Sequence, residues 1–383
     1  MNYRPFGKNN YQVSALGLGC MRLPRIFENN QARVDEEKAF ELIRYAATHG
    51  INYFDTALTY HNSTSEEVLG KALEGGLRKQ VKIATKQPVW FMHTQADIRR
   101  NLENTLKKLR TDYLDIYLIH NINPSCWKEI RQREIFREYE KFREEGMIKS
   151  IGFSFHGGPQ LFSEVLAAYP WEMCQVQQNL LDTDKEATEN AIALAGQKGC
   201  ALVIMEPLRG GGLAQATKEV QSIYDSFPVK RSPVEWAFRH LLNYHQVSTI
   251  LSGMSTMEQL KENIEIFSRP ESLPGCLSSE EKALLNRVKA SYDAINTIPC
   301  TGCEYCMPCP HGVNISRAFA LYNDALRFEN FAPSQRGYWF TTTMGGDAGR
   351  CKECGACTQH CPQGIDIIQQ LKVAHQALKG WIE

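Results

Sequence analysis

The stretch VKIATKQ, residues 81–87, is a short apolar run that indicates a buried strand, and YLDIYLIH, residues 113–120, is a second one. Between them, the apolar residues of ADIRRNLENTLKKLR, residues 96–110, recur with the period of a helix. A strand, a helix and another strand in this order are typical of a parallel sheet. This stretch therefore predicts an α/β fold.

The same alternation extends in both directions along the chain. The eight predicted strands are VSALGLGC (13–20), INYFDTA (51–57), VKIATKQ (81–87), YLDIYLIH (113–120), IKSIGFSF (148–155), MCQVQQN (173–179), ALVIMEP (201–207) and VSTILSG (247–253). Eight strand–helix repeats of this kind favour a (β/α)8 TIM barrel over an open doubly wound sheet. No G-x-G-x-x-G motif follows the first strand, which argues against a Rossmann fold. We predict a barrel domain over residues 1–275.

Eight of the 13 cysteines are concentrated in two runs near the C-terminus, CTGCEYCMPCP (300–310) and CKECGACTQHCP (351–362). The second run fits the C-x2-C-x2-C-x3-C-P pattern of two-cluster ferredoxins, and the first departs from it by one residue. In such ferredoxins the fourth cysteine of each run ligates the other cluster. We therefore predict two [4Fe–4S] clusters, one held by Cys300, Cys303, Cys306 and Cys361, the other by Cys351, Cys354, Cys357 and Cys309.

Structural zinc is the alternative for these runs, because zinc sites made of four cysteines also use C-x2-C pairs. Zinc needs two pairs for each ion and gains nothing from a third step followed by proline, so iron–sulfur is favoured. Residues 314–330 and 364–383 have apolar residues at helical spacing. We therefore expect residues 300–383 to form a small, mainly α-helical ferredoxin-like domain, joined to the barrel by a connecting helix within residues 276–299. Its spacing pattern is similar to that of fumarate reductase iron–sulfur subunits.

Charged residues are balanced, with 43 Lys and Arg against 43 Asp and Glu. This balance disfavours nucleic acid and anionic membrane surfaces as partners. No apolar stretch approaches the ~20 residues of a transmembrane helix. The first residues, MNYRPFGKNNYQ, contain no apolar core of a signal peptide. We therefore expect a cytoplasmic protein.

Four polar residues lie at or shortly after the ends of three consecutive predicted strands, at the barrel face where such folds carry their chemistry. They are Asp55, Tyr60, Lys86 and His120. Taken singly, the aspartate could be a cap, the tyrosine a packing residue, the lysine a structural partner of the aspartate, and the histidine a core residue. As an ordered set on neighbouring strand ends they predict a proton-transfer site.

With these residues in place, the first 270 residues resemble the aldo-keto reductase superfamily. The resemblance is carried by VSALGLGCMRLP, NYFDTALTY, IATK, LDIYLIH, IGFS and MSTMEQLKENI. Together with the cysteine runs, the chain resembles a subfamily in which the reductase is fused to a two-cluster ferredoxin. The resemblance implies an NAD(P)H-dependent oxidoreductase acting on a carbonyl or alcohol substrate. It implies that Tyr60 is the general acid, that Lys86, held by Asp55, lowers the pKa of Tyr60, and that His120 polarises the carbonyl.

The resemblance also implies cofactor contacts at Gly19, Cys20, Met21, Ser154, Gln175, Pro207, Leu208, Arg209, Gly210, Ser252, Gly253, Gln259, Glu262 and Asn263. Ser154 and Gln175 match carboxamide contacts, although the asparagine that usually follows the serine is Phe155 here. The loop EPLRGGGL, residues 206–213, matches the one that covers the pyrophosphate. Gly253 and Gln259 stand where a lysine and an arginine commonly grip the 2′-phosphate of NADPH, so the choice between NADH and NADPH stays open. Trp90, Trp127 and His156 are predicted to line the substrate pocket.

Nicotinamide delivers two electrons as hydride, whereas an iron–sulfur cluster passes one at a time. A flavin commonly bridges the two, and the sequence has no recognisable flavin motif. One hypothesis is a reductase with structural or regulatory clusters. A second is an enzyme whose clusters feed or drain the barrel site, with a ferredoxin or another redox protein as partner. A third is an electron-transfer or docking module of a larger complex with a largely inert barrel.

Overall fold

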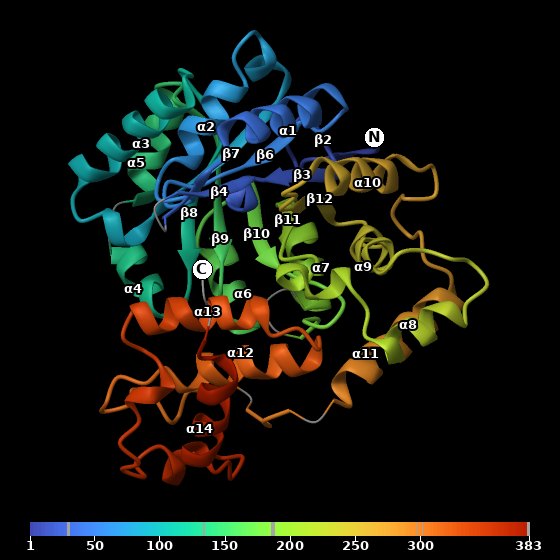
Figure 1. Cartoon of the computed structure of the whole chain (residues 1–383). Coiled ribbons are helices and arrows are strands. Elements are labelled where there is room, and N and C mark those ends of the chain that lie inside the picture. Colours follow the sequence, from blue (N-terminus) through green and yellow to red (C-terminus); the bar gives the residue numbers. More distant parts are fainter. Residues whose placement is uncertain (29–30, 133–134, 185–187, 296, 301, 381–383) are drawn as a thin grey trace. The chain divides into compact units, whose positions relative to one another are not determined.

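Eight parallel strands close into a barrel in the computed structural model of the chain (Figure 1). In barrel order they are β3 (Leu16–Gly19), β6 (Tyr53–Asp55), β7 (Lys82–Pro88), β8 (Leu114–Ile122), β9 (Ile148–Phe155), β10 (Met173–Gln177), β11 (Ala201–Met205) and β12 (Val247–Ser252), which pairs with β3. Each strand overlaps one of the eight predicted runs. The predicted (β/α)8 barrel is therefore confirmed. The structure describes residues 1–383 except 29–30, 133–134, 185–187, 296, 301 and 381–383.

Helices follow the strands and cover them on the outside. They are α1 (Glu36–Thr48), α2 (Ser65–Ala72), α3 (Gln95–Leu109), α4 (Pro124–Gln132), α5 (Ile135–Glu144), α6 (Pro159–Ala168), α7 (Glu189–Gln197), α9 (Pro233–Leu242) and α10 (Met257–Ser268). Helix α3 shows why such segments are helical. Thr94 and Asp97 form a reciprocal capping box at its start, and Arg110 ends it in the left-handed conformation with φ 53°.

A hairpin at the N-terminus closes the amino end of the barrel. Strands β1 (Tyr3–Pro5) and β2 (Gln12–Ser14) pair antiparallel, so the predicted strand 13–20 is in fact divided between β2 and β3. Phe6 and Val13 are fully buried in one cluster with barrel residues such as Tyr53 and Met173. These apolar side chains fill the barrel and leave its polar chemistry to the carboxyl end. A second hairpin, β4 (Arg25–Glu28) with β5 (Gln31–Val34), follows the first barrel strand.

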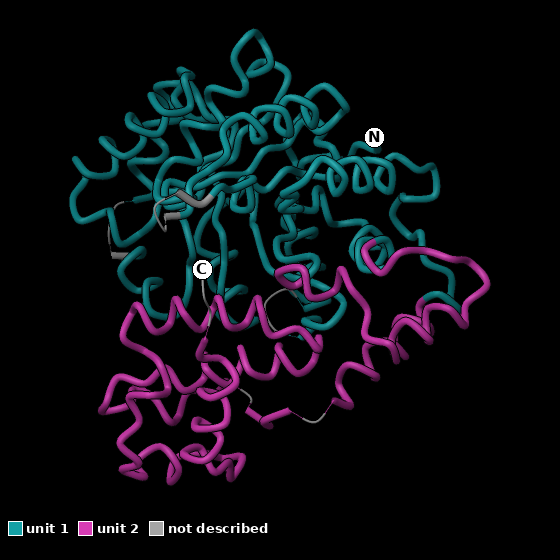
Figure 2. The backbone as a smooth tube through the Cα atoms, viewed as in Figure 1, with its two compact units in different colours: residues 1–208, 235–281 teal, residues 209–234, 282–383 magenta. Residues whose placement is uncertain are grey.

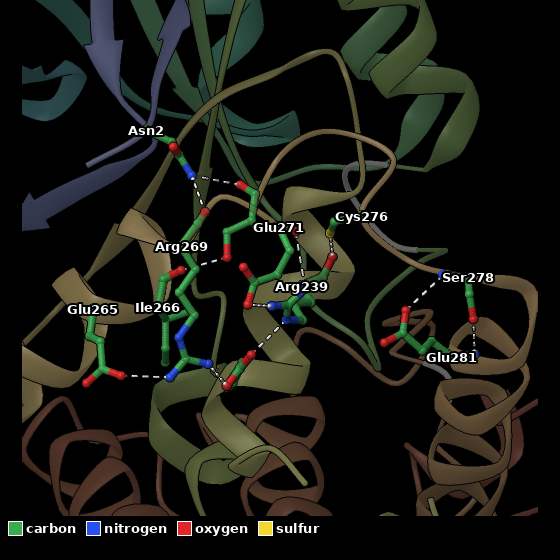
Figure 3. Close-up of polar contacts among 11 residues, drawn as sticks. Asn2, Arg239, Glu265, Ile266, Arg269, Glu271, Cys276, Ser278 and Glu281 are labelled. Carbon is green, nitrogen blue, oxygen red and sulfur yellow. Dashed lines mark hydrogen bonds and ion pairs between the residues drawn. The ribbon is translucent and has the colours of Figure 1, made fainter. Parts of the chain in front are cut away.

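A buried ion network anchors the segment by which the chain leaves the barrel (Figure 3). The Arg239 guanidinium, 1% exposed, lies 2.8 Å from Glu235, and Arg269 lies 2.6 Å from the same carboxylate. Asn2 donates from Nδ2 to the carbonyl oxygen of Arg269 at 2.9 Å, and Glu271 pairs with Arg239 at 3.3 Å. Two arginines sharing one carboxylate keep that buried charge compensated, so this segment is fixed to the first residues of the chain.

The folded chain divides into two compact units that do not follow the order of the sequence (Figure 2). The first comprises residues 1–208 and 235–281, and the second comprises residues 209–234 and 282–383. The elements of the second unit are η4 (Arg209–Ala214), α8 (Lys218–Asp225), most of α11 (Ser279–Asp293), α12 (Ile315–Arg327), α13 (Ala332–Thr343), η5 (Ala348–Arg350), η6 (Thr358–His360) and α14 (Ile367–Leu378).

The C-terminal region is helical, as predicted. Its core is formed by apolar side chains of α12, α13 and α14, including Phe319, Tyr338 and Leu371. Six of the eight cysteines of the two runs pack against this core, whereas Cys303 and Cys354 are exposed. Residues 381–383 of the predicted last helix lie outside the described residues. The domain limits 1–275, 276–299 and 300–383 stay a prediction. Among the described residues, no helix combines the length and the apolarity needed to cross a membrane.

Candidate active site and cluster-binding loops

Three neighbouring strands bring the predicted tetrad together at the carboxyl end of the barrel. Asp55 is the last residue of β6, Lys86 lies near the end of β7, and His120 lies near the end of β8. The strands are in parallel register, with Asp55 opposite Ala84 on β7. Tyr60 is placed by the turn that follows β6. The order of these residues along the chain thus becomes their order around the barrel.

Lys86 is the centre of this group. Its Nζ donates to Asp55 Oδ1 at 2.5 Å, to the carbonyl oxygen of Thr56 at 2.9 Å and to the phenol oxygen of Tyr60 at 3.3 Å. Both Lys86 and Asp55 are 2% exposed. A buried ammonium whose three donors are all engaged is held in one position, directed at the Tyr60 oxygen.

Burial and charge act in opposite directions on these groups. Burial alone would lower the pKa of Lys86, but the adjacent Asp55 carboxylate and Tyr60 phenol outweigh it and raise this pKa. Burial raises the pKa of Asp55, against the opposing effect of Lys86. Burial also raises the pKa of the Tyr60 phenol, although Lys86 pulls it down. The lysine is therefore charged and the phenol protonated at neutral pH.

His120 lies beside the rings of Tyr60 and Trp90 and is influenced by the positive charge of Lys86. Its ring centroid is 6.2 Å from that of Tyr60, with an edge-to-face angle of 79°, and 5.9 Å from the ring of Trp90. Burial, with a further contribution from the Lys86 ammonium, lowers the pKa of His120 to about 3. The imidazole is therefore neutral at physiological pH, and it can donate one hydrogen bond without acting as an acid.

The three predicted pocket residues differ in their surroundings. Trp90, in η3 (Val89–Phe91), is half exposed and stands beside His120. Trp127, in α4, is buried, and its indole donates to Glu164 at 2.9 Å. His156 is exposed directly after β9, and its backbone N–H donates to Ile122. Trp90 is tied to the tetrad by its ring contact with His120, and His156 adds to the lowering of the pKa of His120.

Two predicted carboxamide residues lie opposite each other on adjacent strands. Ser154 of β9 and Gln175 of β10 are register partners, and both are buried. The Ser154 hydroxyl accepts from the backbone N–H of Asn121 at 2.8 Å, while Gln175 Oε1 is buried without a hydrogen-bond partner among the described residues. Sequence reasoning did not find Asn121, a left-handed residue with φ 61°. Two features of the sequence could have indicated it. Asn121 directly follows His120, and asparagine tolerates the left-handed conformation better than most residues.

The remaining cofactor candidates cluster around the first and last barrel strands. Gly19 ends β3, and Cys20 and Met21 form η1 with Arg22. The Cys20 carbonyl oxygen is hydrogen-bonded to His61 Nε2 at 3.1 Å. Beyond β12, Asn263 donates from Nδ2 to Ser252 Oγ at 3.0 Å, whereas Gly253, Gln259 and Glu262 are exposed. These residues form one continuous rim, because β12 pairs with β3.

The predicted pyrophosphate loop is divided between the two compact units. Pro207 and Leu208 close the first, whereas Arg209 and Gly210 open the second. There the Arg209 guanidinium pairs with Asp324 of α12 at 2.9 Å. The resemblance implied Arg209 as a cofactor contact, and in the structure its guanidinium pairs with this carboxylate, 115 residues further along the chain.

The two cysteine runs fold into the same turn. In each run the third and fifth residues have left-handed backbone: Gly302 and Glu304 with φ 69° and 62°, and Glu353 and Gly355 with φ 55° and 77°. This conformation bends the chain between the successive cysteines of each run. The repeat in sequence is therefore also a repeat in backbone geometry.

Thiols from both runs meet. Cys300, Cys303, Cys306 and Cys361 line one cavity together with apolar residues such as Ile315 and Phe319. Burial raises the pKa of Cys300, with smaller contributions from Cys303 and Cys361. Burial likewise raises the pKa of Cys357, and its thiol neighbours are Cys351 and Cys309. Cys306 has Cys300 and Cys303 of its own run and Cys357 of the other run as thiol neighbours. The assignment of four cysteines to each of two clusters stays a prediction.

Comparisons with known proteins match both parts of the chain. The aldo/keto reductase family matches residues 15–273, and a 4Fe-4S dicluster domain matches residues 299–365. A "Probable aldo-keto reductase 1" from Glycine max is 30% identical over 235 residues, which is 59% of this chain and 65% of that relative. The match therefore spans less than two thirds of the relative's length.

Solved aldo-keto reductases have the same barrel. The holo form of AKR11C1 from Bacillus halodurans is 26% identical with a TM-score of 0.63, over 75% of this chain and 96% of that one. The thermostable Tm1743, in complex with the inhibitor epalrestat, is 28% identical with a TM-score of 0.62, over 75% and 100%. The chain belongs to the aldo/keto reductase family and carries a 4Fe-4S dicluster domain C-terminal to its barrel.

Proposed function

We propose that this protein reduces an aldehyde or ketone with NAD(P)H, and oxidises the corresponding alcohol in reverse, through Asp55, Tyr60, Lys86 and His120. The observation that carries the proposal is the position of the Lys86 ammonium. It lies 3.3 Å from the Tyr60 oxygen and is held there by Asp55 at 2.5 Å. A fixed charge beside a phenol stabilises the phenolate that remains after proton donation.

The protonation states suit the direction of reduction. Burial raises the pKa of Tyr60, so the phenol carries its proton when a carbonyl arrives. As negative charge develops on the substrate oxygen, Tyr60 gives up this proton, and Lys86 stabilises the resulting phenolate. In the direction of oxidation, the phenolate takes the proton from the alcohol.

His120 has a positioning and polarising role in this proposal. Because its imidazole is neutral, one ring nitrogen carries a proton that can be donated to the carbonyl oxygen. The low pKa of the ring, about 3, prevents it from competing with Tyr60 as the acid. Trp90, 5.9 Å from His120, would form an apolar wall on this side of the substrate.

The residues at the ends of β9 and β10 fit a nicotinamide. Gln175 Oε1 is a buried acceptor without a partner among the described residues. The N–H group of the nicotinamide carboxamide is a donor that could satisfy it. Ser154, its register partner, adds a hydroxyl. When bound there, the reduced nicotinamide would supply the hydride that adds to the carbonyl carbon. Ser154 and Gln175 would fix the orientation of the ring by holding its carboxamide.

Replacing Tyr60 by phenylalanine tests the assignment. It removes one hydroxyl, and the rate of carbonyl reduction should fall by about 10²–10⁴, the usual contribution of a general acid. Tyr139→Phe is the matched control, because Tyr139 is a buried phenol in α5 outside the site. Turnover by Tyr60→Phe equal to that of the control would refute the proposal.

We propose further that the tail binds two [4Fe–4S] clusters with the crossed ligand sets predicted above. The four-cysteine cavity and the repeated turn support this. The clusters would supply one-electron chemistry, which hydride transfer in the barrel does not need. Replacing Cys354 by serine separates the hypotheses. A reductase keeps its NAD(P)H-dependent rate in this variant, whereas a site fed through clusters, with or without a flavin, loses it while the barrel stays folded.

The proposed location, substrate and partner follow from the cysteines and from the proposed reaction. A reducing compartment keeps the eight cysteines free of disulfides and available to a cluster, so we propose a cytoplasmic location. The substrate is a small carbonyl or alcohol compound. A ferredoxin or another redox protein would be a partner if the clusters exchange electrons during turnover. If the barrel of purified enzyme reduced no carbonyl compound, the third hypothesis, a docking module, would take the place of this proposal.

A further inference from the structure

An arginine occupies the place of a missing side chain at the end of the barrel. Gly253 directly follows β12, and a Cβ atom built there would lie 2.9 Å from Arg22 Cγ and 3.0 Å from Arg22 Cβ. Arg22 is the last residue of η1, after β3, and β3 pairs with β12. The aliphatic stem of Arg22 therefore begins where a side chain at position 253 would have begun.

The backbone on both sides of this contact is held in place. Ser255 donates from its hydroxyl to the carbonyl oxygen of Arg22 at 2.7 Å. The backbone N–H of Ser255 donates to Gln259 Oε1 at 2.9 Å, and the Gln259 N–H donates to Thr256 Oγ1 at 3.3 Å at the start of α10. Residue 22 and residues 253–259 thus form one connected rim, and Gln259 is engaged in supporting it.

The charge of Arg22 is available for a ligand. The residue is exposed, and no hydrogen bond or ion pair among the described residues engages its guanidinium. A guanidinium offers a planar pair of donors that matches the oxygens of a phosphate. Its neighbours on the rim, Gly253, Ser255 and Gln259, carry no charge. The rim therefore has no basic side chain at positions 253 and 259, where the resemblance implies a lysine and an arginine, and it has one at position 22.

We propose that Arg22 reads the 2′-phosphate of NADPH, in place of the basic residues absent at positions 253 and 259, and makes the enzyme selective for NADPH over NADH. This inference rests on the proposed NAD(P)H dependence. Gly253 has a part in it, because the absence of a Cβ lets the Arg22 stem lie across the rim. The hydroxyl of Ser255, which donates to the Arg22 carbonyl, is a positioning group.

Direct binding of cofactor fragments to the full-length, cluster-loaded protein tests the proposal without turnover. The probes are 2′,5′-ADP, which carries the 2′-phosphate, and 5′-AMP, which lacks it; both are titrated by calorimetry. The native protein should prefer 2′,5′-ADP, and added salt should weaken this preference. Arg22→Ala should reduce the ratio of the two affinities by about tenfold to a hundredfold, as expected for the loss of a charge-assisted contact.

Three further variants make the result specific. Arg22→Lys keeps a charge without the planar donors and should retain part of the selectivity. Gly253→Ala pushes on the Arg22 stem and should cause a smaller loss of selectivity than Arg22→Ala. Arg100→Ala, which removes an exposed arginine from α3, is the matched control for net charge and should leave the ratio unchanged.

The outcomes are separable from those of the proposed function. Equal loss of both affinities in Arg22→Ala, or no change in either, would overturn the proposal and make Arg22 a packing residue. A native protein that binds both probes equally would overturn it as well. Because no catalysis is measured, normal activity of Tyr60→Phe would disprove the tetrad assignment and leave the selectivity result standing.

Discussion

Replacing Lys86 by methionine should cost both stability and activity, for two separable reasons. Methionine is close to lysine in length but has no charge, so it leaves the Asp55 carboxylate, 2% exposed, without its 2.5 Å partner. Removing one member of a buried ion pair typically costs about 3–5 kcal/mol. We therefore expect the free energy of unfolding of the barrel at pH 7 to fall by an amount in this range.

The stability loss should depend on pH in a defined direction. Burial already raises the pKa of Asp55 in the presence of Lys86, and it raises this pKa further when the ammonium is gone. A carboxyl group whose pKa is higher in the folded than in the unfolded state favours folding at low pH. The destabilisation should therefore be largest at neutral pH and should shrink as the pH falls through the pKa of Asp55 in the folded variant.

Activity should fall for the other reason. The Lys86 ammonium lies 3.3 Å from the Tyr60 oxygen, and it pulls the phenol pKa down against burial. Without it the phenol becomes a weaker acid, and the rate constant for carbonyl reduction should drop by about 10²–10⁴. The assays are urea unfolding followed by tryptophan fluorescence, and NADPH oxidation with a panel of aldehydes and ketones.

The double variant Lys86→Met/Asp55→Leu distinguishes the two effects. Replacing both partners of a buried pair by apolar residues is often neutral for stability, so the double variant should recover much of the stability and none of the activity. The reasoning is wrong if the single variant is as stable as the native protein at pH 7. It is equally wrong if the double variant regains its turnover.

Other perturbations test the histidine, the clusters and the packing of the helices. The His120 pKa of about 3 lies below its unfolded value near 6.5, so stability should decline as pH falls from 6.5 toward 3, and His120→Phe should flatten this decline in urea titrations. Cys361→Ala should reduce bound iron from about eight to about four atoms per chain, measured by iron analysis and electron paramagnetic resonance, and Cys309→Ala should remove the other cluster; loss of all iron from both variants would leave the pairing unsupported. A Cβ at Gly70 would lie 2.5 Å from the Lys108 carbonyl oxygen, so Gly70→Ala should destabilise the α2–α3 contact by about 1–3 kcal/mol, seen as a lower melting temperature.

The barrel could be predicted because its strands are buried on both faces. Such strands are continuous apolar runs, and amphipathic helices separate them, so local pattern alone identifies all eight. The N-terminal hairpin could not be found in this way. Its strands β1 and β2 have three residues each, and their position depends on Phe6 entering the barrel, which is a contact with distant residues.

Part of the candidate site could likewise be predicted from the sequence, and part could not. Asp55, Lys86 and His120 could be proposed from the sequence because each lies at or near a strand end, and parallel strands bring their ends together. Contacts between side chains far apart in the chain left no local signal. The pairing of Arg209 with Asp324 and the placement of Arg22 across Gly253 both depend on which loops meet in the folded chain.

The grouping of residues 209–234 with the tail changes what can be exchanged or removed in this protein. Arg209 is paired with Asp324, and a Cβ at Gly212 would lie 2.8 Å from the ring of Phe328. A chain cut after the barrel would therefore expose a guanidinium and a glycine-rich loop that have adapted to residues no longer present. In evolutionary terms, the tail cannot be gained or lost independently of this loop. Losing it, or grafting it onto another reductase, would require compensating substitutions in the loop after β11.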